Sequence, residues 1–163
     1  MIRRLEPHEV ALHRSLRLRA LEDAPDSFGD RFDDIRVRPS SYWEDLTRSV
    51  TGADRHAMFL CVSETAVCGS AYGLVDEHRA GIGRVGGMWV EPASRGRGIG
   101  AALLDAVIEW ARERRLTRLE LWAPAHSAAA LALYRASGFS ETGARRAMPG
   151  RTHLAIVEMG RDL

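Results

Sequence analysis

The stretch at residues 90–104 constrains this chain more than any other part of its sequence. A strand-like apolar run precedes it, and a segment with helical apolar periodicity follows it at once. The glycines and arginines between them form the run Arg95-Gly96-Arg97-Gly98-Ile99-Gly100. A strand, a glycine-rich turn and a helix start bring backbone N–H groups together beside the positive end of the helix dipole. The sequence therefore predicts a phosphate or pyrophosphate site at this turn.

A second glycine pattern lacks the flanking strand and helix that a phosphate site requires. The run Gly81-Ile-Gly83-Arg-Val-Gly86 matches the literal spacing of a dinucleotide-binding fingerprint. That fingerprint needs a strand before it and a helix after it. Here a polar turn precedes the glycines and a strand-like run follows them. We therefore expect no dinucleotide site at these glycines.

Length and charge exclude several functional classes. With 163 residues, the chain suits one domain, residues 1–163, with a single core. Its net charge of +1 gives no electrostatic reason to expect a nucleic acid or a membrane surface as partner. The chain lacks an apolar run of the roughly 18 residues that span a bilayer, and it lacks a hydrophobic signal region. We expect a soluble, cytoplasmic protein.

The two cysteines, Cys61 and Cys68, are too few for a disulfide framework, and their spacing is not that of a metal site. We expect no metal. If Glu64 and Thr65 form a two-residue turn, the cysteines face each other across a hairpin. Either two packed thiols or a disulfide would fit there, and a cytoplasmic location favours the thiols.

The periodicity of apolar residues predicts a mixed α/β chain. Strands are expected at residues 2–5, 57–62, 66–75, 84–90, 116–123, 139–146 and 152–159. Helices are expected at residues 10–22, 40–51, 99–115 and 128–137. Ser127 and Gly138 are typical caps for the last of these helices, and Ser41 with Glu44 has the spacing of a capping box for the second. This order, β-α-α-β-β-β-α-β-α-β-β, indicates a mixed sheet with helices on both sides.

Two motifs in this order of elements resemble the GNAT superfamily of acetyl-CoA-dependent N-acetyltransferases. The family's phosphate-loop pattern, Arg/Gln-x-x-Gly-x-Gly/Ala, is matched by the run that ends at Gly100. Its second pattern, Asn-x-x-Ala-x-x-Leu-Tyr-x-x-x-Gly-Phe, is matched from Ser127 through Tyr134 to Phe139, with a serine in place of the asparagine. The resemblance implies a GNAT-like fold, whose mostly antiparallel central sheet splays between the fourth and fifth strands.

The resemblance also implies where the co-substrate acetyl-CoA binds. The strand that ends at Val90 would pair through its backbone with the pantetheine arm, as an additional strand would. The loop amides would hold the pyrophosphate. The hydroxyl of Ser127 is shorter than the family's asparagine side chain, so the direct bond to the pantetheine amide would be either lost or mediated by water. The expected contact residues are Met88, Trp89, Val90, Arg95, Gly96, Arg97, Gly98, Ile99, Gly100, Ala101, Ser127 and Tyr134.

Catalytic roles follow from the same resemblance. Tyr134 would protonate the departing CoA thiolate, because a phenol with a reference pKa of about 10 carries its proton at neutral pH. The N–H of Val90 would meet the charge that develops on the thioester oxygen. Histone-type relatives carry a catalytic glutamate early in the fourth strand, where this chain has Arg84, so that base is absent here.

Several groups are candidates for the base that takes the proton of the acceptor amine. Glu120 lies on the expected fifth strand, where some relatives place a glutamate, and it shares a face with Trp122. His126, His78 and His153 lie on expected turns, strands or helix ends, and imidazole titrates near neutral pH. Bulk water is the remaining alternative. Each of these side chains is also compatible with a purely structural or solvated role.

In this family the acceptor site lies between the first two helices, the fifth strand and the last hairpin. Those regions hold Tyr42, Trp43 and Trp122, and residues 22–34 contain six acids. The acidic segment is either a solvated loop or a rim that attracts a cation. Aromatic rings and carboxylates together suit a cationic amine. We expect a small cationic amine, a metabolite or an antibiotic-like molecule, as the acceptor.

Two other functions stay open at this point. One is acetylation of a protein, at its N-terminal amine or at a lysine. The other, from a different class, is a non-catalytic acetyl-CoA-binding module, which the presence of Tyr134 disfavours. The expected partner is a small-molecule amine, with no nucleic acid and no membrane, and a homodimer, common in the family, is left open.

Overall fold

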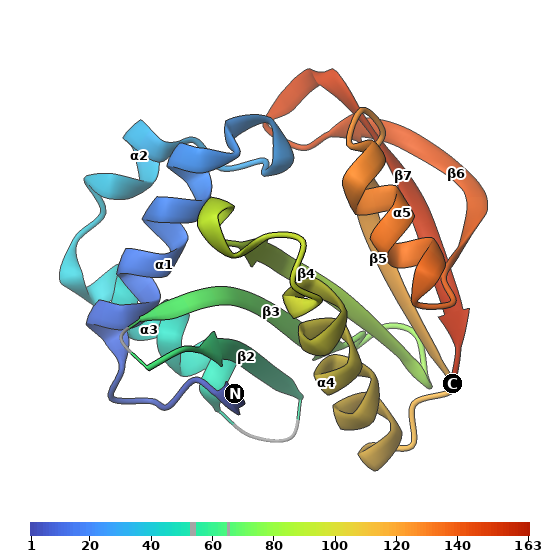
Figure 1. The fold of residues 1–163 in the computed structure, drawn as a ribbon, viewed down its shortest axis with the longest axis horizontal. Helices are drawn as coiled ribbons and strands as arrows, with labels where there is room; N and C mark the ends of the chain where they lie inside the picture. The colour runs from blue at the N-terminus through green and yellow to red at the C-terminus, as the bar shows by residue number, and fades with distance from the viewer. Residues whose placement is uncertain (53–54, 65) are drawn as a thin grey trace.

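Within the part of the chain that the structure describes, a seven-stranded sheet forms the centre of the molecule (Figure 1). The computed structural model describes residues 1–52, 55–64 and 66–163. The strands lie in the order β1-β2-β3-β4-β5-β7-β6, and neighbours are antiparallel except β4 and β5. They are β1 (Ile2–Arg4), β2 (His56–Val62), β3 (Val67–Val75), β4 (Ile82–Val90), β5 (Arg118–Pro124), β6 (Ser140–Met148) and β7 (Arg151–Asp162).

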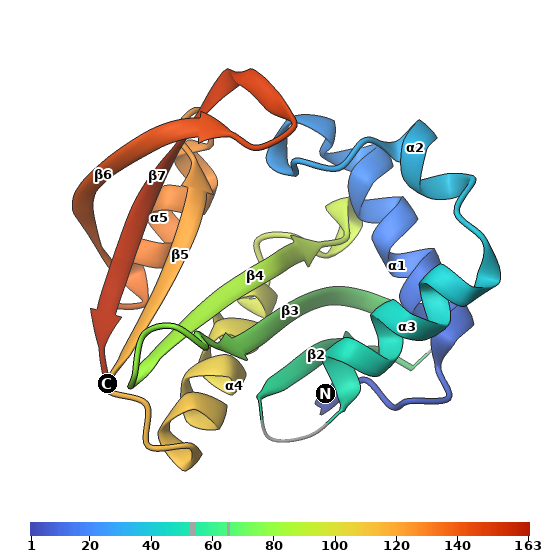
Figure 2. The ribbon, with the colours of Figure 1, turned by 180° about the vertical axis from the view of Figure 1, so that it is seen from behind.

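Helices cover both faces of this sheet. They are α1 (Val10–Asp23), α2 (Phe32–Arg36), α3 (Ser40–Thr51), α4 (Ile99–Glu113) and α5 (Ala128–Ala136). Figure 2 shows α3 in front of the half formed by β2 and β3, with α4 behind the sheet. No helix of the described residues combines the length and the apolar character that crossing a bilayer requires.

The predicted mixed α/β order is confirmed, with two local differences. The short helix α2 begins within the acidic segment, extends two residues beyond it and is anchored by the buried side chain of Ile35. The predicted capping box at Ser41 and Glu44 is wrong, because the N–H of Tyr42 donates to the carbonyl of Pro39 (3.1 Å). Pro39 therefore occupies the N-cap position, no side chain caps α3, and Ser41 is already helical.

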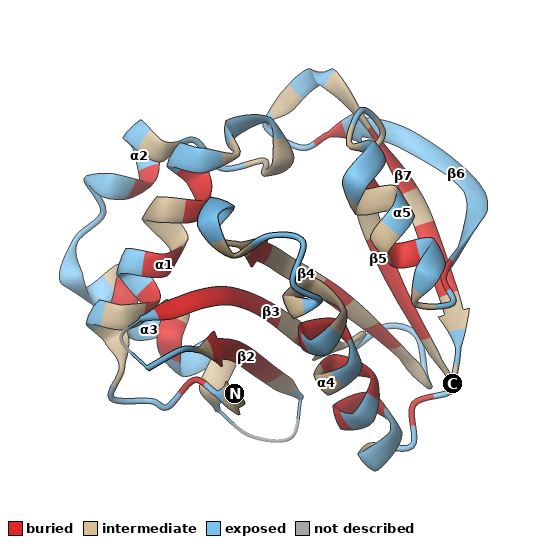
Figure 3. Cartoon of the chain, viewed as in Figure 1, coloured by how far each residue is buried: buried red, intermediate tan, exposed pale blue. Residues whose placement is uncertain are grey.

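Strand alternation sends the apolar side chains to two separate layers. Figure 3 shows the buried residues along the central strands and on parts of α1 and α4. On one face, α4 packs against β2, β3 and β4. Its buried stripe is Leu103, Leu104, Val107, Ile108, Trp110 and Ala111, at the spacing that the sequence predicts. On the other face, Leu16 and Ala20 of α1 pack against Met58 and Leu60 of β2. A ligand site on the sheet is thus confined to places that neither layer fills.

β4 and β5 run side by side only where both begin. Their pairing covers Ile82 with Arg118, Gly83 with Leu119, and Arg84 with Glu120. Farther along, β4 places Gly87 and Met88 opposite the single residue Ala71 of β3, and Gly87 has a φ of +59°. Such a bulge bends the strand that carries it. β4 then follows β3 while β5 follows β7, so the expected splay between the fourth and fifth strands is confirmed (Figure 2).

The two cysteines lie in the apolar layer beneath α4. Both are buried free thiols, and the Sγ of Cys68 donates to the carbonyl of Cys61 (3.3 Å). Cys61 opposes Gly69 rather than Cys68, because the register of β2 and β3 shifts between Cys61 and Val62. Thr65, half of the predicted turn, lies outside the described residues. The structure thus contains the packed thiols that the sequence favours.

The contact between α4 and β3 provides a test of this packing. The Cβ of an alanine at Gly73 would lie 2.7 Å from ring atoms of Trp110, so Gly73→Ala must push the helix away from the strand. We expect a loss of about 1–3 kcal/mol in the free energy of unfolding, measured by urea denaturation. The same substitution in a Trp110→Leu background should cost much less. Equal losses in both backgrounds would contradict this account.

Candidate active site

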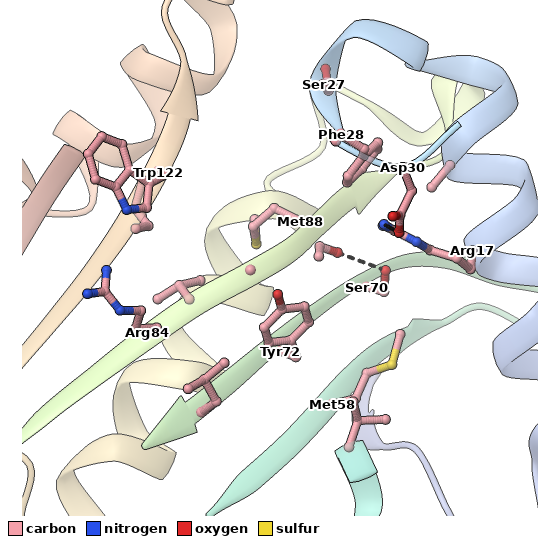
Figure 4. Close-up of a pocket in the computed structure, with 18 of the residues that line it drawn as sticks. Arg17, Ser27, Phe28, Asp30, Met58, Ser70, Tyr72, Arg84, Met88 and Trp122 are labelled. Atoms are coloured by element: carbon pink, nitrogen blue, oxygen red, sulfur yellow. Dashed lines mark hydrogen bonds and ion pairs between the residues drawn. The ribbon is translucent and has the colours of Figure 1, made fainter. Parts of the chain in front are cut away.

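A cavity of about 550 Å³ lies at the splay, on the face of the sheet that α1 and α3 cover. Figure 4 shows Tyr72 of β3, Met88 of β4 and Trp122 of β5 around this space. α5 contributes Tyr134 and β6 contributes Arg146. One continuous space therefore joins residues from both halves of the sheet and from helices on both of its faces.

Two loops that are far apart in the sequence meet at one end of this cavity (Figure 1). The Cβ of an alanine at Gly29, in the loop after α1, would lie 2.4 Å from the carbonyl oxygen of Pro149, between β6 and β7. The guanidinium of Arg151 donates to the carbonyl oxygen of Pro25 across the same contact (2.9 Å). Gly29 and Pro149 both line the cavity. This backbone contact limits the room at that end and suits a small ligand.

The outer part of β4 presents backbone groups to the splay. The N–H of Glu91 donates to the carbonyl of Cys68 (2.9 Å), so these two residues form a hydrogen-bonded pair. In an antiparallel ladder the next pair, Val90 with Gly69, directs its N–H groups away from the partner strand. The N–H of Val90 therefore faces the β5 side, where an extended ligand arm can pair with it.

The loop between β4 and α4 forms an open backbone cradle. Gly96 and Gly98 both have a φ of +75°, and a Cβ built on either one meets no atom within 4 Å. Gly98 is the N-cap of α4, and no side chain caps this end. The N–H groups of Ile99, Gly100 and Ala101 consequently have no partner within the helix. Amides in this position fit a pyrophosphate, as the sequence predicts.

The arginines and the tryptophan beside this loop differ in their surroundings. Arg95 forms an ion pair with Asp23 of α1, and its Nε donates to the carbonyl of Val90 (3.0 Å). The buried indole of Trp89 also donates to Asp23 (2.9 Å), so its side chain holds the loop against α1. Arg97 is exposed and makes no ion pair with any described residue. Of the two arginines, Arg97 is the one available to a phosphate.

The position of α5 is set by its caps and by one glycine. Ser127 accepts a hydrogen bond from the N–H of Ala130 (3.3 Å), which confirms its predicted capping role. Gly138 follows the helix with a φ of +83°, as expected of a C-terminal glycine. The Cβ of an alanine at Gly100 would lie 3.0 Å from a methyl group of Leu133. Gly100 therefore lets the start of α4 approach α5 closely.

Tyr134 projects from α5 into the cavity. Its side chain is 7% exposed, and burial raises the pKa of its phenol to about 12. The ring packs edge-on against Phe139, with 6.2 Å between the ring centroids. Tyr134 therefore keeps its proton throughout the physiological pH range and can donate it to a group inside the cavity.

Glu120 is held in an ion-pair cluster at the closed end of the splay. The guanidinium of Arg79 donates to both of its carboxylate oxygens (2.6 and 3.0 Å), and the Nε of Arg118 donates to one of them (3.2 Å). The guanidinium of Arg84 lies 3.7 Å from the carboxylate of Glu120. The hydrogen bond from Arg79 is the main cause that lowers the pKa of Glu120. A buried carboxylate with these partners is a weak proton acceptor, which argues against the predicted role of general base.

The three histidines suggested by the sequence do not line the cavity. His126, His78 and His153 are all exposed. The cavity is lined instead by His13 of α1, which is 5% exposed and has its Nδ1 3.0 Å from the Oγ1 of Thr47. Burial, with a smaller contribution from Arg17, lowers the pKa of His13 to about 4. His13 is therefore a neutral cavity wall at physiological pH.

The acids of residues 22–34 do not form a free acidic rim. Asp30 lines the cavity, but its carboxylate pairs with Arg17 (2.7 Å). Asp23 pairs with Arg95, and Asp26 lies 3.8 Å from Arg151. Arginines from other elements thus neutralise the acids nearest the site, and the predicted attraction of a cation is not supported.

Several cavity residues are missed by the sequence analysis. The phenol of Tyr72 lies against the β4 bulge, where a Cβ on Gly86 would be 2.3 Å from its ring. The guanidinium of Arg146 lies 4.3 Å from the ring centroid of Trp122. Trp43, suggested as an acceptor aromatic, is buried between α1, α2 and α3 instead. The alternation of residues 66–75 places Tyr72 on the cavity face, but no local pattern indicates the contacts of Arg146.

Comparison of the sequence with known proteins identifies relatives of this chain. The sequence model of the Acetyltransferase (GNAT) family matches residues 17–139. The chain is 30% identical over 132 residues to a mycothiol acetyltransferase of Beutenbergia cavernae. The matched region covers 77% of this chain but only 39% of that protein. It is 29% identical over 147 residues to an aminoglycoside N(6')-acetyltransferase type 1 of Stenotrophomonas maltophilia, with 86% of both chains covered.

A solved structure has the same fold. It is a GNAT superfamily phosphinothricin acetyltransferase from Sinorhizobium meliloti in complex with AcCoA, with a TM-score of 0.81 and 19% identity. The match covers 100% of this chain and 88% of the other. The family uses acetyl-CoA, as the sequence analysis expects, and the open cradle at Gly96 and Gly98 fits its pyrophosphate.

Substitution in the glycine loop tests the cradle. Gly98→Ala forces an L side chain into a left-handed backbone at a cost of about 1–2 kcal/mol, or turns the adjoining amides away. We expect the Kd of acetyl-CoA, measured by isothermal titration calorimetry, to rise about 10-fold. Gly143→Ala is a matched control, because Gly143 has a φ of +92° and an equally open Cβ position but lies on β6. Similar weakening by both substitutions would count against the cradle.

Substitution of Glu120 separates a structural role from a catalytic one. Because the pKa of Glu120 is lowered from 4.5, its ion pairs contribute stability above that pH, and this contribution is lost as the pH falls through the lowered pKa. Glu120→Gln should therefore reduce the free energy of unfolding by about 1–3 kcal/mol at pH 7, with a smaller difference in acid. Thermal or urea unfolding against pH measures this effect. A large fall in kcat with unchanged stability would restore Glu120 as the base.

Proposed function

The chain belongs to the GNAT family of acetyltransferases, and from that premise we propose that it acetylates the amine of a small molecule by direct attack on acetyl-CoA. One observation carries the proposal. Tyr134 and Met88, on the side where the co-substrate is expected, line the same cavity as Tyr42 and Phe28, on the side where the acceptor is expected. Donor and acceptor can therefore meet within one space of limited size.

In this proposal the loop and the edge of β4 hold the co-substrate. Acetyl-CoA supplies an acetyl group that is already activated as a thioester. The first amides of α4 bind its pyrophosphate, together with the exposed Arg97. The backbone at Met88 and Val90 pairs with the pantetheine arm, and Ser127 keeps its hydroxyl beside that arm while it caps α5. Arg95 and Trp89 contribute by fixing the loop against α1.

Two groups act on the charges that develop during transfer. The N–H of Val90 faces the β5 side and stabilises negative charge on the thioester oxygen. The phenol of Tyr134 gives its proton to the sulfur that leaves as the new amide bond forms. A side chain that keeps its proton at neutral pH can act only as the acid at this step.

The proton of the acceptor amine goes to water in this proposal. An ammonium group cannot attack, because its lone pair holds a proton. Glu120 is engaged by three arginines, and His126, His78 and His153 lie away from the cavity. Neutral His13 has too low a pKa to be an effective base. The rate should therefore follow the neutral fraction of the amine.

The acceptor is proposed to be a small molecule rather than a protein segment. The contact of Gly29 with Pro149 closes one end of the cavity, and a peptide passing there would have to separate the two loops. Relatives named for mycothiol and for an aminoglycoside are consistent with a small acceptor. The cationic character expected from the sequence lacks support, since Asp30 already pairs with Arg17.

A first experiment tests the transfer itself. The full chain is mixed with acetyl-CoA and a panel of small amines, and release of the CoA thiol is followed together with the mass of the acetylated product. We expect amine-dependent thiol release with stoichiometric product. A protein that binds acetyl-CoA but releases no thiol with any amine would be a binding module instead. Acetylation of peptides without acetylation of small amines would favour a protein substrate.

Tyr134→Phe tests the proposed acid. Loss of the phenolic proton removes general acid catalysis, which contributes about 10²–10⁴-fold. We expect kcat to fall within that range while the Kd of acetyl-CoA changes less than threefold, because the ring and its packing against Phe139 remain. Tyr72→Phe, which also removes a cavity phenol, is the matched control. Equal effects of the two substitutions on kcat would contradict the assignment.

A further inference from the structure

We infer that the acceptor amine carries a carboxylate, and that Arg146 binds this carboxylate at the rim of the cavity. The inference rests on the proposed function, because it names the class of amine that the same cavity accepts. It depends on the charges that line the cavity and on the way in which Arg146 is held.

The charged side chains that line the cavity are almost all neutralised within the protein. Among the described residues they are Arg17, Asp30, Arg84 and Arg146. Arg17 and Asp30 pair with each other (2.7 Å). Arg84 lies within ion-pair distance of the carboxylates of Asp76 (3.3 Å), Glu158 (3.6 Å) and Glu120 (3.7 Å). Arg146 makes no ion pair with any residue that the structure describes, so the uncompensated charge of the lining is positive.

Arg146 is fixed by an aromatic ring rather than by an acid. Its guanidinium carbon lies 4.3 Å from the ring centroid of Trp122 on β5. Stacking occupies the face of a guanidinium and leaves the N–H donors in its plane available. These donors form a planar fork that matches the two oxygens of a carboxylate. A guanidinium held over a ring in this way can offer its donors to a carboxylate.

The place of this guanidinium relates it to the reaction. Trp122 lies on β5 two residues beyond Glu120, where the pairing of β4 with β5 has ended. Its ring and Arg146 line the same cavity as Met88 and Tyr134, on the side where the co-substrate is proposed to bind. A carboxylate bound there anchors a small acceptor next to the thioester site, where its amine must attack.

The remaining cavity walls indicate the character of the acceptor apart from its amine and its carboxylate. The wall formed by α3 and β2 is apolar and includes Leu46, Val50 and Met58, with Tyr42 beside them. An amine, a carboxylate and an apolar body together describe an amino acid with an apolar side chain. A polycationic amine would instead place a second positive charge near the unpaired Arg146, which costs affinity.

Amino acids and their carboxamides provide the test. L-Leucine, L-methionine and L-phenylalanine are each compared with the corresponding amide as acceptors, and kcat/KM is measured for both members of a pair. The enzymes are the wild type, Arg146→Gln, Arg146→Lys and the matched control Arg145→Gln. Arg145 is the neighbouring residue on β6, is exposed and does not line the cavity. Differences in amine basicity cancel, because each variant meets the same six acceptors.

We expect the acid-to-amide ratio of kcat/KM to fall about 10-fold in Arg146→Gln, mainly through a higher KM for the acids. Arg146→Lys should retain part of the ratio, since it keeps the charge but loses the fork. Arg145→Gln should leave the ratio unchanged, and the KM for acetyl-CoA should stay the same in all variants. A merely structural role of Arg146 would affect acids and amides alike, which would overturn the inference.

Two further outcomes separate this inference from the proposed function. If the wild type acetylates amides or polyamines and Arg146→Gln leaves the acid-to-amide ratio of kcat/KM unchanged, the carboxylate site is wrong while acetyl transfer stands. If acetyl-CoA binds but no amine of either kind releases the CoA thiol, the proposed function fails, and the inference fails with it. A thermal melt of each variant checks that exposed Arg146 is not needed for folding.

Discussion

The molecule depends on how far β4 stays paired with β5. The two strands are joined over three residue pairs, and the buried carboxylate of Glu120 holds Arg79, Arg84 and Arg118 at that end. These ion pairs keep the buried carboxylate of Glu120 compensated, so they stabilise the end at which the two strands are paired. The bulge at Gly87 bends β4 away beyond it. The cavity, the open edge of β4 and the approach of α5 all follow from this divergence.

The open backbone cradle before α4 could be predicted from the sequence because its determinants are contiguous. A strand, a loop with positive-φ glycines and an uncapped helix start occupy neighbouring residues, and their physical requirements appear as a local pattern. Gly100 adds close helix packing to this pattern, since its neighbour in space is Leu133. The strands and long helices were predictable for the same reason, because apolar periodicity is local. The capping box failed because α3 begins two residues earlier than a cap at Ser41 would place it, with Pro39 in the N-cap position.

The charge pairing around the cavity could not be predicted, because it arises from residues that are distant in the chain. Alternation places Glu120 on one face with Trp122, but it does not indicate that Arg79 will donate to both carboxylate oxygens. The acidic segment suggests a site that attracts a cation, but in the structure Arg17 pairs with Asp30 and Arg151 lies near Asp26. These arginines belong to other elements, so the sequence of the segment does not reveal the pairing. His13 lies at helical spacing with Leu16 and Ala20, so apolar periodicity could have predicted that it faces inward. Its contact with Thr47 on α3 could not be predicted in this way.

Arg145 and Arg146 illustrate how one sequence feature acquires two roles. β6 is an edge strand of the sheet, and charged side chains on an edge discourage pairing with another chain. Two adjacent arginines would serve that purpose equally well. Alternation, however, sends them to opposite faces: Arg145 opposes Val157 in the register, and Arg146 opposes Ile156 on the cavity side. Only Arg146 meets the ring of Trp122, and only there does an edge charge become a group that can select an acceptor. The overall charge of +1 conceals this difference, because specificity depends on which charges remain unpaired beside the site.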